Sequence, residues 1–257
     1  MGDSTARVII YDLETAPNLS YIWGHWEQNA IAHVREWHLL SIAWKFLGDR
    51  KVQAASLPDF SLYATDPHND QALVEFLHGL LDECDIAITH NGKAFDDKKA
   101  NARFIYHNLQ PPSPYKQIDT LQVARHGFAF NSNSLNDLCE HLNIGTKKPH
   151  NGFKTWLGCM NNDEKSWKTM VEYNIYDVVL LDKLYHRLLP WIPHHPNLTT
   201  MNDDRPEACP RCGKGPMQKR GWLYAGVTKR QRFQCTACGG YCAGRQIVRS
   251  DSQYQTI

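Results

Sequence analysis

The chain has 257 residues, of which 42% are hydrophobic and 21% charged, a composition typical of globular proteins rather than disordered ones. No run approaches the roughly 20 apolar residues of a membrane helix, and the polar N-terminus does not resemble a signal peptide, so we expect a cytoplasmic protein without membrane contact. The net charge of +1 conceals an uneven distribution, because the chain from Arg205 onward carries ten Lys or Arg against two acids, and the remainder is acidic.

Apolar spacing predicts the secondary structure up to residue 190. Strands are expected at 7–12, 39–46, 51–57, 85–89 and 117–119, with a hairpin turn at Gly48-Asp49. Helices are expected at 69–84, 94–108, 120–125 and 163–190, and from an N-cap at Ser134 to Leu142. The stretch 147–158 has no regular pattern.

Strands followed by strand–helix alternation predict an α/β fold, with a mixed sheet flanked by helices. The prolines between Pro190 and Pro196 end the last helix, and the polar segment after them has the composition of a linker. We therefore predict a first domain at 1–196, a linker at 197–206 and a small C-terminal module at 207–257.

The first candidate site lies at the end of the first strand, where Asp12 and Glu14 are two residues apart. The two-residue period of a strand places both carboxylates on one face, where they repel each other unless a cation lies between them. Because the preceding residues are apolar, the pair lies at the mouth of a buried strand. The alternative is a harmless pair on a solvated strand.

A second candidate is the segment His90-Asn91-Gly92-Lys93-Ala94-Phe95-Asp96, which follows a buried strand and opens a helix. Asp96 is expected to point back toward the strand ends. The next residue, Asp97, is expected to be a solvent-facing acid in the first helical turn. Lys98 and Lys99 either meet phosphates or form a solvated face, and we favour the solvated face.

The third candidate lies in the last long helix, where Tyr173 and Asp177 are four residues apart and share a face. Asp177 borders an apolar stripe, and a buried carboxylate without a partner is costly, so a metal ion would suit it. Otherwise Tyr173 is a core aromatic and Asp177 a salt-bridge partner. The loop 147–152 is a candidate lining of a substrate channel.

Taken in order, these segments resemble the three sequence motifs of the DEDD superfamily of 3′–5′ exonucleases, which have a ribonuclease-H-like fold. Asp12-x-Glu14, Asn91-Gly92-x-x-Phe95-Asp96 and Tyr173-x-x-x-Asp177 are similar to the motifs of its tyrosine branch. Ile118-Asp119-Thr120-Leu121 resembles a segment that commonly follows the second motif. The similarity covers residues 7–192, and this part of the chain resembles stand-alone exonuclease-like proteins of phages and bacteria, some of which carry added zinc modules. This resemblance would place the protein in a bacterial or infected host cytosol.

The resemblance implies that Asp12, Glu14, Asp96 and Asp177 hold two Mg²⁺ or Mn²⁺ ions, for which oxygen ligands are suited. Tyr173 would orient the attacking water, and the product would be a nucleoside 5′-monophosphate. Leu13, Thr15 and Asn91 would contact the terminal nucleotide. Single-stranded DNA is favoured as the substrate, and DNA over RNA.

Two Cys-x-x-Cys pairs in the tail predict a structural zinc site. Cys209, Cys212, Cys235 and Cys238 have the spacing of a zinc ribbon, in which two tight turns supply four thiolates to one ion. Cys242 is expected to be a spare thiol. Such a small module buries little apolar surface, so metal binding is expected to fold it.

Basic and aromatic residues alternate between the two cysteine pairs, a pattern suited to phosphate contact and base stacking. Lys229, Arg230 and Arg232 are the candidate nucleic-acid contacts, although the aromatics could instead form the small core of the ribbon. Two alternatives to an exonuclease stay open: a catalytically inactive, zinc-dependent nucleic-acid adaptor, and a ribonuclease or structure-selective endonuclease on the same fold.

Overall fold

The central element of the protein is a five-stranded mixed sheet, seen in a computed structural model that describes residues 6–26, 29–147, 152–201 and 205–249. Its strands are β1 (Val8–Thr15), β4 (Leu39–Phe46), β5 (Gln53–Ser56), β6 (Ile86–Thr89) and β7 (Lys116–Asp119). The order is β5-β4-β1-β6-β7; β1 is antiparallel to β4 and parallel to β6. The predicted mixed sheet is confirmed, and β4 has the predicted bounds.

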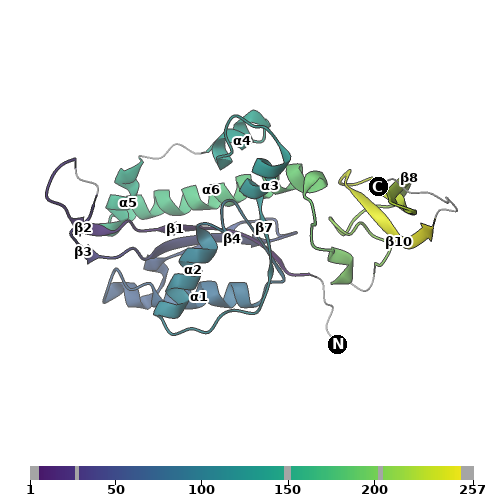
Figure 1. Ribbon diagram of the computed structural model, residues 1–257. Coiled ribbons are helices and arrows are strands. Elements are labelled where there is room, and N and C mark those ends of the chain that lie inside the picture. Colours follow the sequence, from purple (N-terminus) through teal and green to yellow (C-terminus); the bar gives the residue numbers. More distant parts are fainter. Residues whose placement is uncertain (1–5, 27–28, 148–151, 202–204, 250–257) are drawn as a thin grey trace.

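Helices cover both faces of this sheet (Figure 1). Helices α1 (Gln71–Asp82) and α2 (Asp96–Tyr106) lie on one face, and α3 (Thr120–Gly127), α4 (Leu135–His141) and α6 (Glu164–Leu188) lie on the other. Ile9, Tyr11 and Leu13 of β1 belong to the core under α1 and α2, whereas Val8 and Ile10 belong to the core under α6. This alternation places the next two even-numbered positions, Asp12 and Glu14, on the α6 side.

Helix α5 and the strands β2 and β3 were not predicted from the sequence. Residues 147–158 were expected to be irregular, but Phe153–Met160 forms helix α5, which packs against α6. Only Thr155 and Cys159 of α5 are buried, which is why its sequence has a weak apolar pattern. Strands β2 (Leu19–Tyr21) and β3 (Ala32–Arg35) pair with each other in a separate two-stranded sheet. Neither strand contains a fully buried residue, so both lack the usual alternation.

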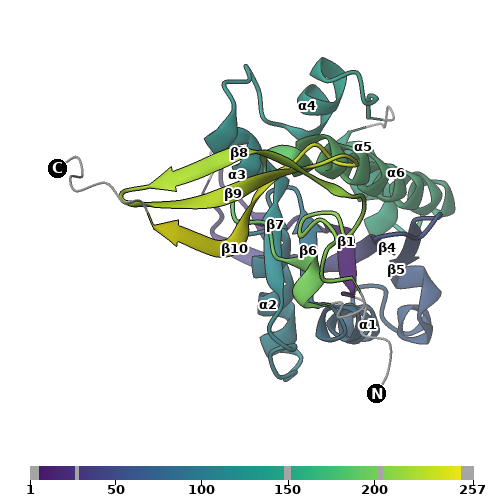
Figure 2. The ribbon, with the colours of Figure 1, turned by 90° about the vertical axis from the view of Figure 1, so that its right-hand side faces the viewer.

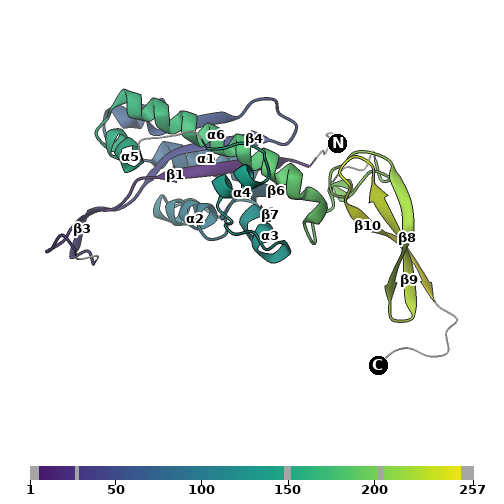
Figure 3. The same cartoon turned by 90° about the horizontal axis from the view of Figure 1, so that it is seen from above.

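The C-terminal module is a three-stranded antiparallel sheet of β8 (Met217–Ala225), β9 (Thr228–Cys235) and β10 (Tyr241–Arg249), in the order β10-β9-β8. It lies beyond the C-terminal end of α6, as seen from the end of the molecule in Figure 2. Seen from above, the β2–β3 hairpin and this module occupy opposite ends of the molecule (Figure 3). The domain boundaries proposed from the sequence stay predictions.

No helix within the described part of the chain is both long enough and apolar enough to cross a bilayer. The longest, α6, has 25 residues, but acidic and basic side chains are spread along it. Two hydrogen bonds join the C-terminal module to the segment that follows α6: the Arg211 guanidinium donates to the carbonyl of Ile192, and Leu198 N–H donates to Pro210 O (2.8 Å).

Candidate active site

Three carboxylates converge at the C-terminal end of β1. Asp12 and Glu14 from β1 and Asp177 from α6 each offer an oxygen atom within 4.8 Å of the other two. The β-strand period turns the first two toward α6, and Asp177 lies on the helix face that packs against the sheet. Asp177 is buried and the other two are partly buried. Oxygen ligands at this spacing can bind a hard divalent cation such as Mg²⁺ or Mn²⁺.

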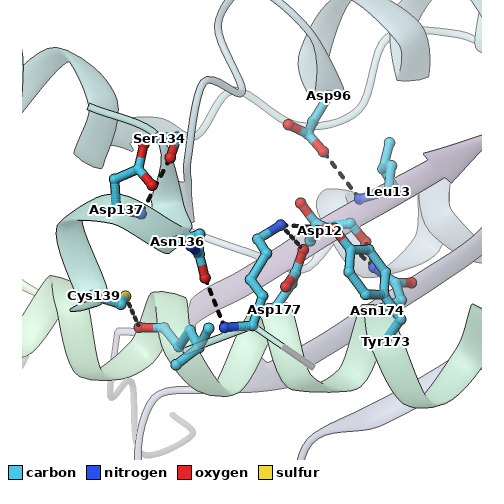
Figure 4. Close-up of polar contacts among 12 residues, drawn as sticks. Asp12, Leu13, Asp96, Ser134, Asn136, Asp137, Cys139, Tyr173, Asn174 and Asp177 are labelled. Carbon is cyan, nitrogen blue, oxygen red and sulfur yellow. Dashed lines mark hydrogen bonds and ion pairs between the residues drawn. The ribbon is translucent and has the colours of Figure 1, made fainter. Parts of the chain in front are cut away.

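Asp96, the first residue of α2, approaches the same place from the other side (Figure 4). Its Oδ1 accepts a hydrogen bond from the backbone N–H of Leu13, 3.0 Å away, between Asp12 and Glu14. Asp96 is not part of the three-residue group within 4.8 Å, but it is adjacent to it and only 2% exposed. The structure therefore brings the four predicted carboxylates to one strand end, three of them in direct proximity.

The turn before Asp96 is fixed by backbone constraints. Asn91 has a φ of 71°, and a side chain at Gly92 would collide with Thr89, whose Oγ1 would lie 2.0 Å from the added Cβ. Buried Asp119 at the end of β7 accepts hydrogen bonds from the N–H groups of Asn91 (2.9 Å) and Lys93 (3.3 Å). Asp119 thus positions the turn that delivers Asp96, a role that the sequence did not reveal.

Mutual repulsion and burial disfavour charge on these acids. Burial, and then the neighbouring Asp177, raises the pKa of Asp12 from 3.8 to about 7. Burial raises the pKa of Glu14 as well, with Asp12 and Asp177 adding to it, and burial followed by Asp12 raises that of Asp96. A divalent cation among these carboxylates would reverse this effect, because it favours the charged form.

A lysine lies among the carboxylates. Nζ of Lys147 forms an ion pair with Asp177 and donates to the hydroxyl of Tyr173 at 2.8 Å. Burial opposes its charge, but Asp177 and these hydrogen bonds prevail and raise the pKa of Lys147. The Lys147 N–H donates to Asn136 Oδ1 (2.8 Å), which ties the residue to α4. The sequence marked this loop as a channel lining but gave no sign of this contact; residues 148–151 of the loop lie outside the described residues.

Asn174 also acts on the site without having been predicted. It is fully buried in α6 and donates from Nδ2 to Asp12 Oδ2 at 2.8 Å, while its Oδ1 accepts from Ser41 of β4 (3.0 Å). Asn174 therefore holds the Asp12 carboxylate in place. Its position next to Tyr173 within the third motif was the only available signal.

Tyr173 lies beside Asp177 as the helical spacing predicts. Burial, and then Asp177, raises the pKa of Tyr173 to about 12, so its hydroxyl stays protonated at neutral pH. The ring of Trp156 from α5 meets it edge to face, with the ring centroids 6.1 Å apart. A protonated hydroxyl fixed in this way can orient a water molecule.

His90, Asp97 and Lys99, which lie around Asp96 in the sequence, make contacts within the protein. Asp97 was expected to face solvent, which is wrong: it is 6% exposed and accepts a hydrogen bond from the hydroxyl of buried Tyr11 at 2.8 Å. Lys99 was expected on a solvated face, but its Nζ lies 3.6 Å from the centroid of the Trp37 ring. His90 bonds to Thr120 Oγ1 and to Asn133 O, at 2.9 and 3.0 Å.

The predicted nucleotide contacts occupy different environments. Leu13 is 2% exposed and its N–H is bonded to Asp96, whereas Thr15 and Asn91 are partly exposed beside the carboxylates. Their contact with a nucleotide stays a prediction.

The four predicted cysteines gather in the C-terminal module, each offering a sulfur within 4.8 Å of the others. Cys209 and Cys238 sulfurs are 3.8 Å apart, and those of Cys212 and Cys235 are 3.7 Å apart. A tetrahedral zinc ion with Zn–S bonds of about 2.3 Å requires sulfur separations of roughly 3.8 Å. The geometry therefore fits one structural Zn²⁺, and Cys242 is not part of the group.

The basic side chains of the module fall on two faces. Strand alternation and the pairing of β9 place Arg230 and Arg232 on one face and Lys229 on the other. The Arg232 guanidinium lies 5.5 Å from the centroid of Tyr241, and Lys229 Nζ lies 4.7 Å from that of Trp222. A flat ligand on one face would contact the arginines or the lysine, but not all three.

Comparison with known proteins agrees with this architecture. A model of the RNase_H superfamily matches residues 46–189, more than half of the chain. The match begins after β1, so it contains Asp96 and Asp177 but neither Asp12 nor Glu14. A search of curated proteins found no match.

Among solved structures, the family B DNA polymerase of the hyperthermophilic archaeon Pyrobaculum calidifontis is similar, with a TM-score of 0.51 and 14% sequence identity. The alignment covers 72% of this chain and 25% of the polymerase, so the chain spans about a quarter of the length of that protein. At this identity the likeness concerns the fold, which is a ribonuclease-H-like mixed sheet flanked by helices.

Proposed function

The chain belongs to the RNase_H superfamily, and from this premise we propose that it is a two-metal-ion 3′–5′ exonuclease that releases nucleoside 5′-monophosphates from single-stranded nucleic acid, DNA in preference to RNA. The observation that carries the proposal is the convergence of Asp12, Glu14 and Asp177 within 4.8 Å, with Asp96 beside them. Such a set of carboxylates is costly unless cations neutralise it.

Asp12, Glu14, Asp96 and Asp177 would hold the metal ions. Two bound divalent ions supply stabilisation of the attacking and leaving oxygens of an in-line displacement at phosphorus. Asn174 fixes one oxygen of Asp12, and the Leu13 N–H fixes one oxygen of Asp96, so both side chains keep their orientation before metal binds.

Tyr173 would position the attacking water rather than take its proton, because its pKa of about 12 keeps the hydroxyl protonated. Lys147 supplies a positive charge beside Asp177, close to where the scissile phosphate would lie. Its ammonium group can exchange Asp177 for a phosphate oxygen when metal ions occupy the carboxylates, which would help to stabilise the negative charge of the reacting phosphate.

The C-terminal module would hold one structural zinc ion and contact nucleic acid through its basic strand, with Lys229, Arg230 and Arg232 as the candidate residues. It lies beyond the C-terminal end of α6 (Figure 3), whereas Asp177 lies 11 residues before that end, a separation of about three helical turns. Its contribution would be to hold the strand rather than to cleave it.

The test is digestion of 5′-labelled single-stranded DNA, duplex DNA and RNA with Mg²⁺, Mn²⁺ or a chelator. We expect metal-dependent shortening from the 3′ end, release of mononucleotides, and inhibition by a blocked 3′ end. Asp12→Ala and Asp177→Ala should each lower the rate by at least about a thousandfold, as expected when charge stabilisation in the transition state is lost. The matched control is Glu75→Gln, which removes an exposed acid of α1.

Internal fragments would instead identify an endonuclease, and preference for RNA a ribonuclease. Metal-independent binding with no cleavage of any substrate would leave the inactive adaptor. Full activity of the folded Asp12→Ala protein would remove the carboxylates from the mechanism.

A further inference from the structure

The β2–β3 hairpin exposes large aromatic side chains at one end of the molecule. Trp23 and Trp26 are 85% and 88% exposed, and Tyr21 is 66% exposed. Ile22, Ile31 and Val34 on the same hairpin are each at least 50% exposed. Clustered exposed apolar residues of this size mark interaction surfaces in soluble proteins, since their burial is strongly favourable.

The base of the hairpin is firmly built. The N–H of Trp37 donates to Asn18 Oδ1 (2.8 Å), and the N–H of Ala16 donates to His38 O (2.9 Å). Further out, Ile31 N–H donates to Tyr21 O at 2.9 Å. Tyr21 therefore lies on the paired ribbon, and Trp23 and Trp26 lie in the loop that joins its two strands. An isolated two-stranded hairpin gains little stability from its own packing.

The hairpin is continuous with the candidate active site. Leu19 follows Glu14 by five residues, so the two α-carbons are at most about 18 Å apart. At the base, the Trp37 ring lies 3.6 Å from Nζ of Lys99, which is three residues after Asp96 in α2. Figure 3 shows the hairpin projecting from the end of the molecule where β1 ends, beside α2.

We propose that Trp23 and Trp26 stack on unpaired bases of the nucleic-acid strand whose 3′ end occupies the carboxylate site. The inference rests on the proposed nuclease function and adds to it a second contact, which selects single-stranded segments. Aromatic rings stack on any base without reading its sequence, and the strand next to a nuclease site must run along a neighbouring surface.

The lysines beside the hairpin, rather than the hairpin itself, favour nucleic acid as the occupant. Between Asn18 and Trp37 the chain has one arginine, Arg35, no lysine, and two acidic residues, Glu27 and Glu36. The hairpin itself therefore offers base stacking rather than phosphate binding. Exposed Lys93 and Lys98 lie at the start of α2, where phosphates of a stacked strand could be neutralised. In a duplex the base faces are already stacked on each other, so exposed indoles fit unpaired bases better.

The experiment measures binding by the full chain carrying Asp12→Ala, which prevents cleavage, with fluorescein-labelled oligothymidylate of about 20 nucleotides and an abasic strand of the same length. We expect the Trp23→Ala/Trp26→Ala variant to bind oligothymidylate at least tenfold more weakly than the parent, and abasic DNA as the parent does. The salt dependence should be unchanged, because it reports phosphate contacts.

Two matched variants complete the test. Trp191→Ala removes an indole that is 67% exposed at the other end of the domain, and it should leave binding unchanged. Trp23→Phe/Trp26→Phe should restore most of the affinity, since it keeps the aromatic faces. Equal binding by the alanine variant, or equal loss on abasic DNA, would overturn the proposal.

The alternative occupant of the hairpin is a second copy of the chain, and sedimentation tests it. If sedimentation shows that the parent is a dimer and the alanine variant a monomer with unchanged DNA affinity, the hairpin binds a second copy of the chain and the proposal is wrong. The nuclease proposal is tested separately by digestion with the unmodified chain. Base-dependent binding without any digestion would leave the stacking surface in place and remove the nuclease.

Discussion

The sheet domain and the C-terminal module both gather metal-binding side chains, but for opposite structural reasons. The sheet domain has a large apolar core on each face of β1, whereas within described residues 205–249 only Cys209 and Cys235 are buried hydrophobic residues. In the module, metal binding replaces a core. In the sheet domain the carboxylates are added to a core that is already sufficient, and they weaken it when no metal is bound.

The largest difference should appear when zinc is removed. Structural zinc contributes on the order of 10 kcal/mol to small ribbons, so Cys209→Ser or a thiol-competing chelator should unfold the module. The sheet domain should keep its fold, because the zinc ligands contact its core only near the end of α6. Hydrogen exchange measured by peptide would show loss of protection in 205–249 alone.

The zinc prediction has a specific counter-outcome. Cys212 and Cys238 pack against the core beneath α6, and Arg211 bonds to the carbonyl of Ile192. Loss of protection along α6 and β1 at the same zinc concentration would mean that the two regions fold as one unit. Cys242→Ser is the control, and it should leave zinc content unchanged.

The stability of the sheet domain should fall in acid because of a buried histidine, His38. Burial lowers the pKa of His38 from 6.5 to about 4, opposed only in part by Asp70. The unfolded chain takes up this proton near pH 6.5 and the folded chain only near pH 4, so the free energy of unfolding falls as the pH drops between these values. The expected loss is roughly 2 kcal/mol between pH 7 and pH 5.

Denaturant unfolding of the His38→Phe protein at both pH values would measure this contribution. The variant should lose less stability than the parent on acidification. His126→Phe makes the same chemical change at an exposed position of α3. It should lose as much free energy of unfolding between pH 7 and pH 5 as the parent does. An unchanged pH dependence in His38→Phe would assign the acid sensitivity to other groups.

A smaller effect should separate stability from activity at the carboxylate site. Asp12→Asn removes one of three mutually repelling charges while keeping an oxygen that can accept the Asn174 hydrogen bond. In the absence of Mg²⁺ and Mn²⁺ at neutral pH, we expect about 1 kcal/mol of added stability together with loss of cleavage. Thermal unfolding without divalent cations measures it.

The contrast is Asp137→Asn, in which an exposed helix acid accepts a hydrogen bond from Ser132 and should not gain stability when neutralised. If Asp12→Asn, like Asp137→Asn, fails to raise the free energy of unfolding of the metal-free protein, repulsion among the carboxylates is not the dominant effect at Asp12.

The sequence predicted the sheet domain well because its signals are local. The buried strands β1, β4 and β6 and the long helix α6 are strongly periodic or continuously apolar, so their positions follow from pattern alone. Helix α5 and the β2–β3 hairpin escaped prediction because neither buries a full face.

The candidate site was predictable only as far as its motifs reach. Asp12, Glu14, Asp96 and Asp177 sit in motifs whose spacing could be read in one dimension, and the structure brings them to one strand end. Lys147 reaches this place through a loop and a bond to Asn136, and Asp97 turns inward to meet Tyr11 across the core. Such contacts between distant segments have no signature in a single sequence.

The smallest predicted effect concerns which face of the module contacts nucleic acid. Arg230 and Arg232 lie on one face of β9 and Lys229 on the other. If the arginine face binds, Arg230→Gln/Arg232→Gln should lower the slope of log affinity against log salt concentration by about 1.4, since each contact with a phosphate of a single strand releases about 0.7 of a counterion. Lys229→Gln should then leave the slope unchanged.

The measurement uses the Asp12→Ala protein and single-stranded DNA, and the reverse pattern would place the strand on the Trp222 face. Equal slopes for all variants would mean that the module holds no phosphate, and that its basic charge serves another purpose than binding the substrate strand.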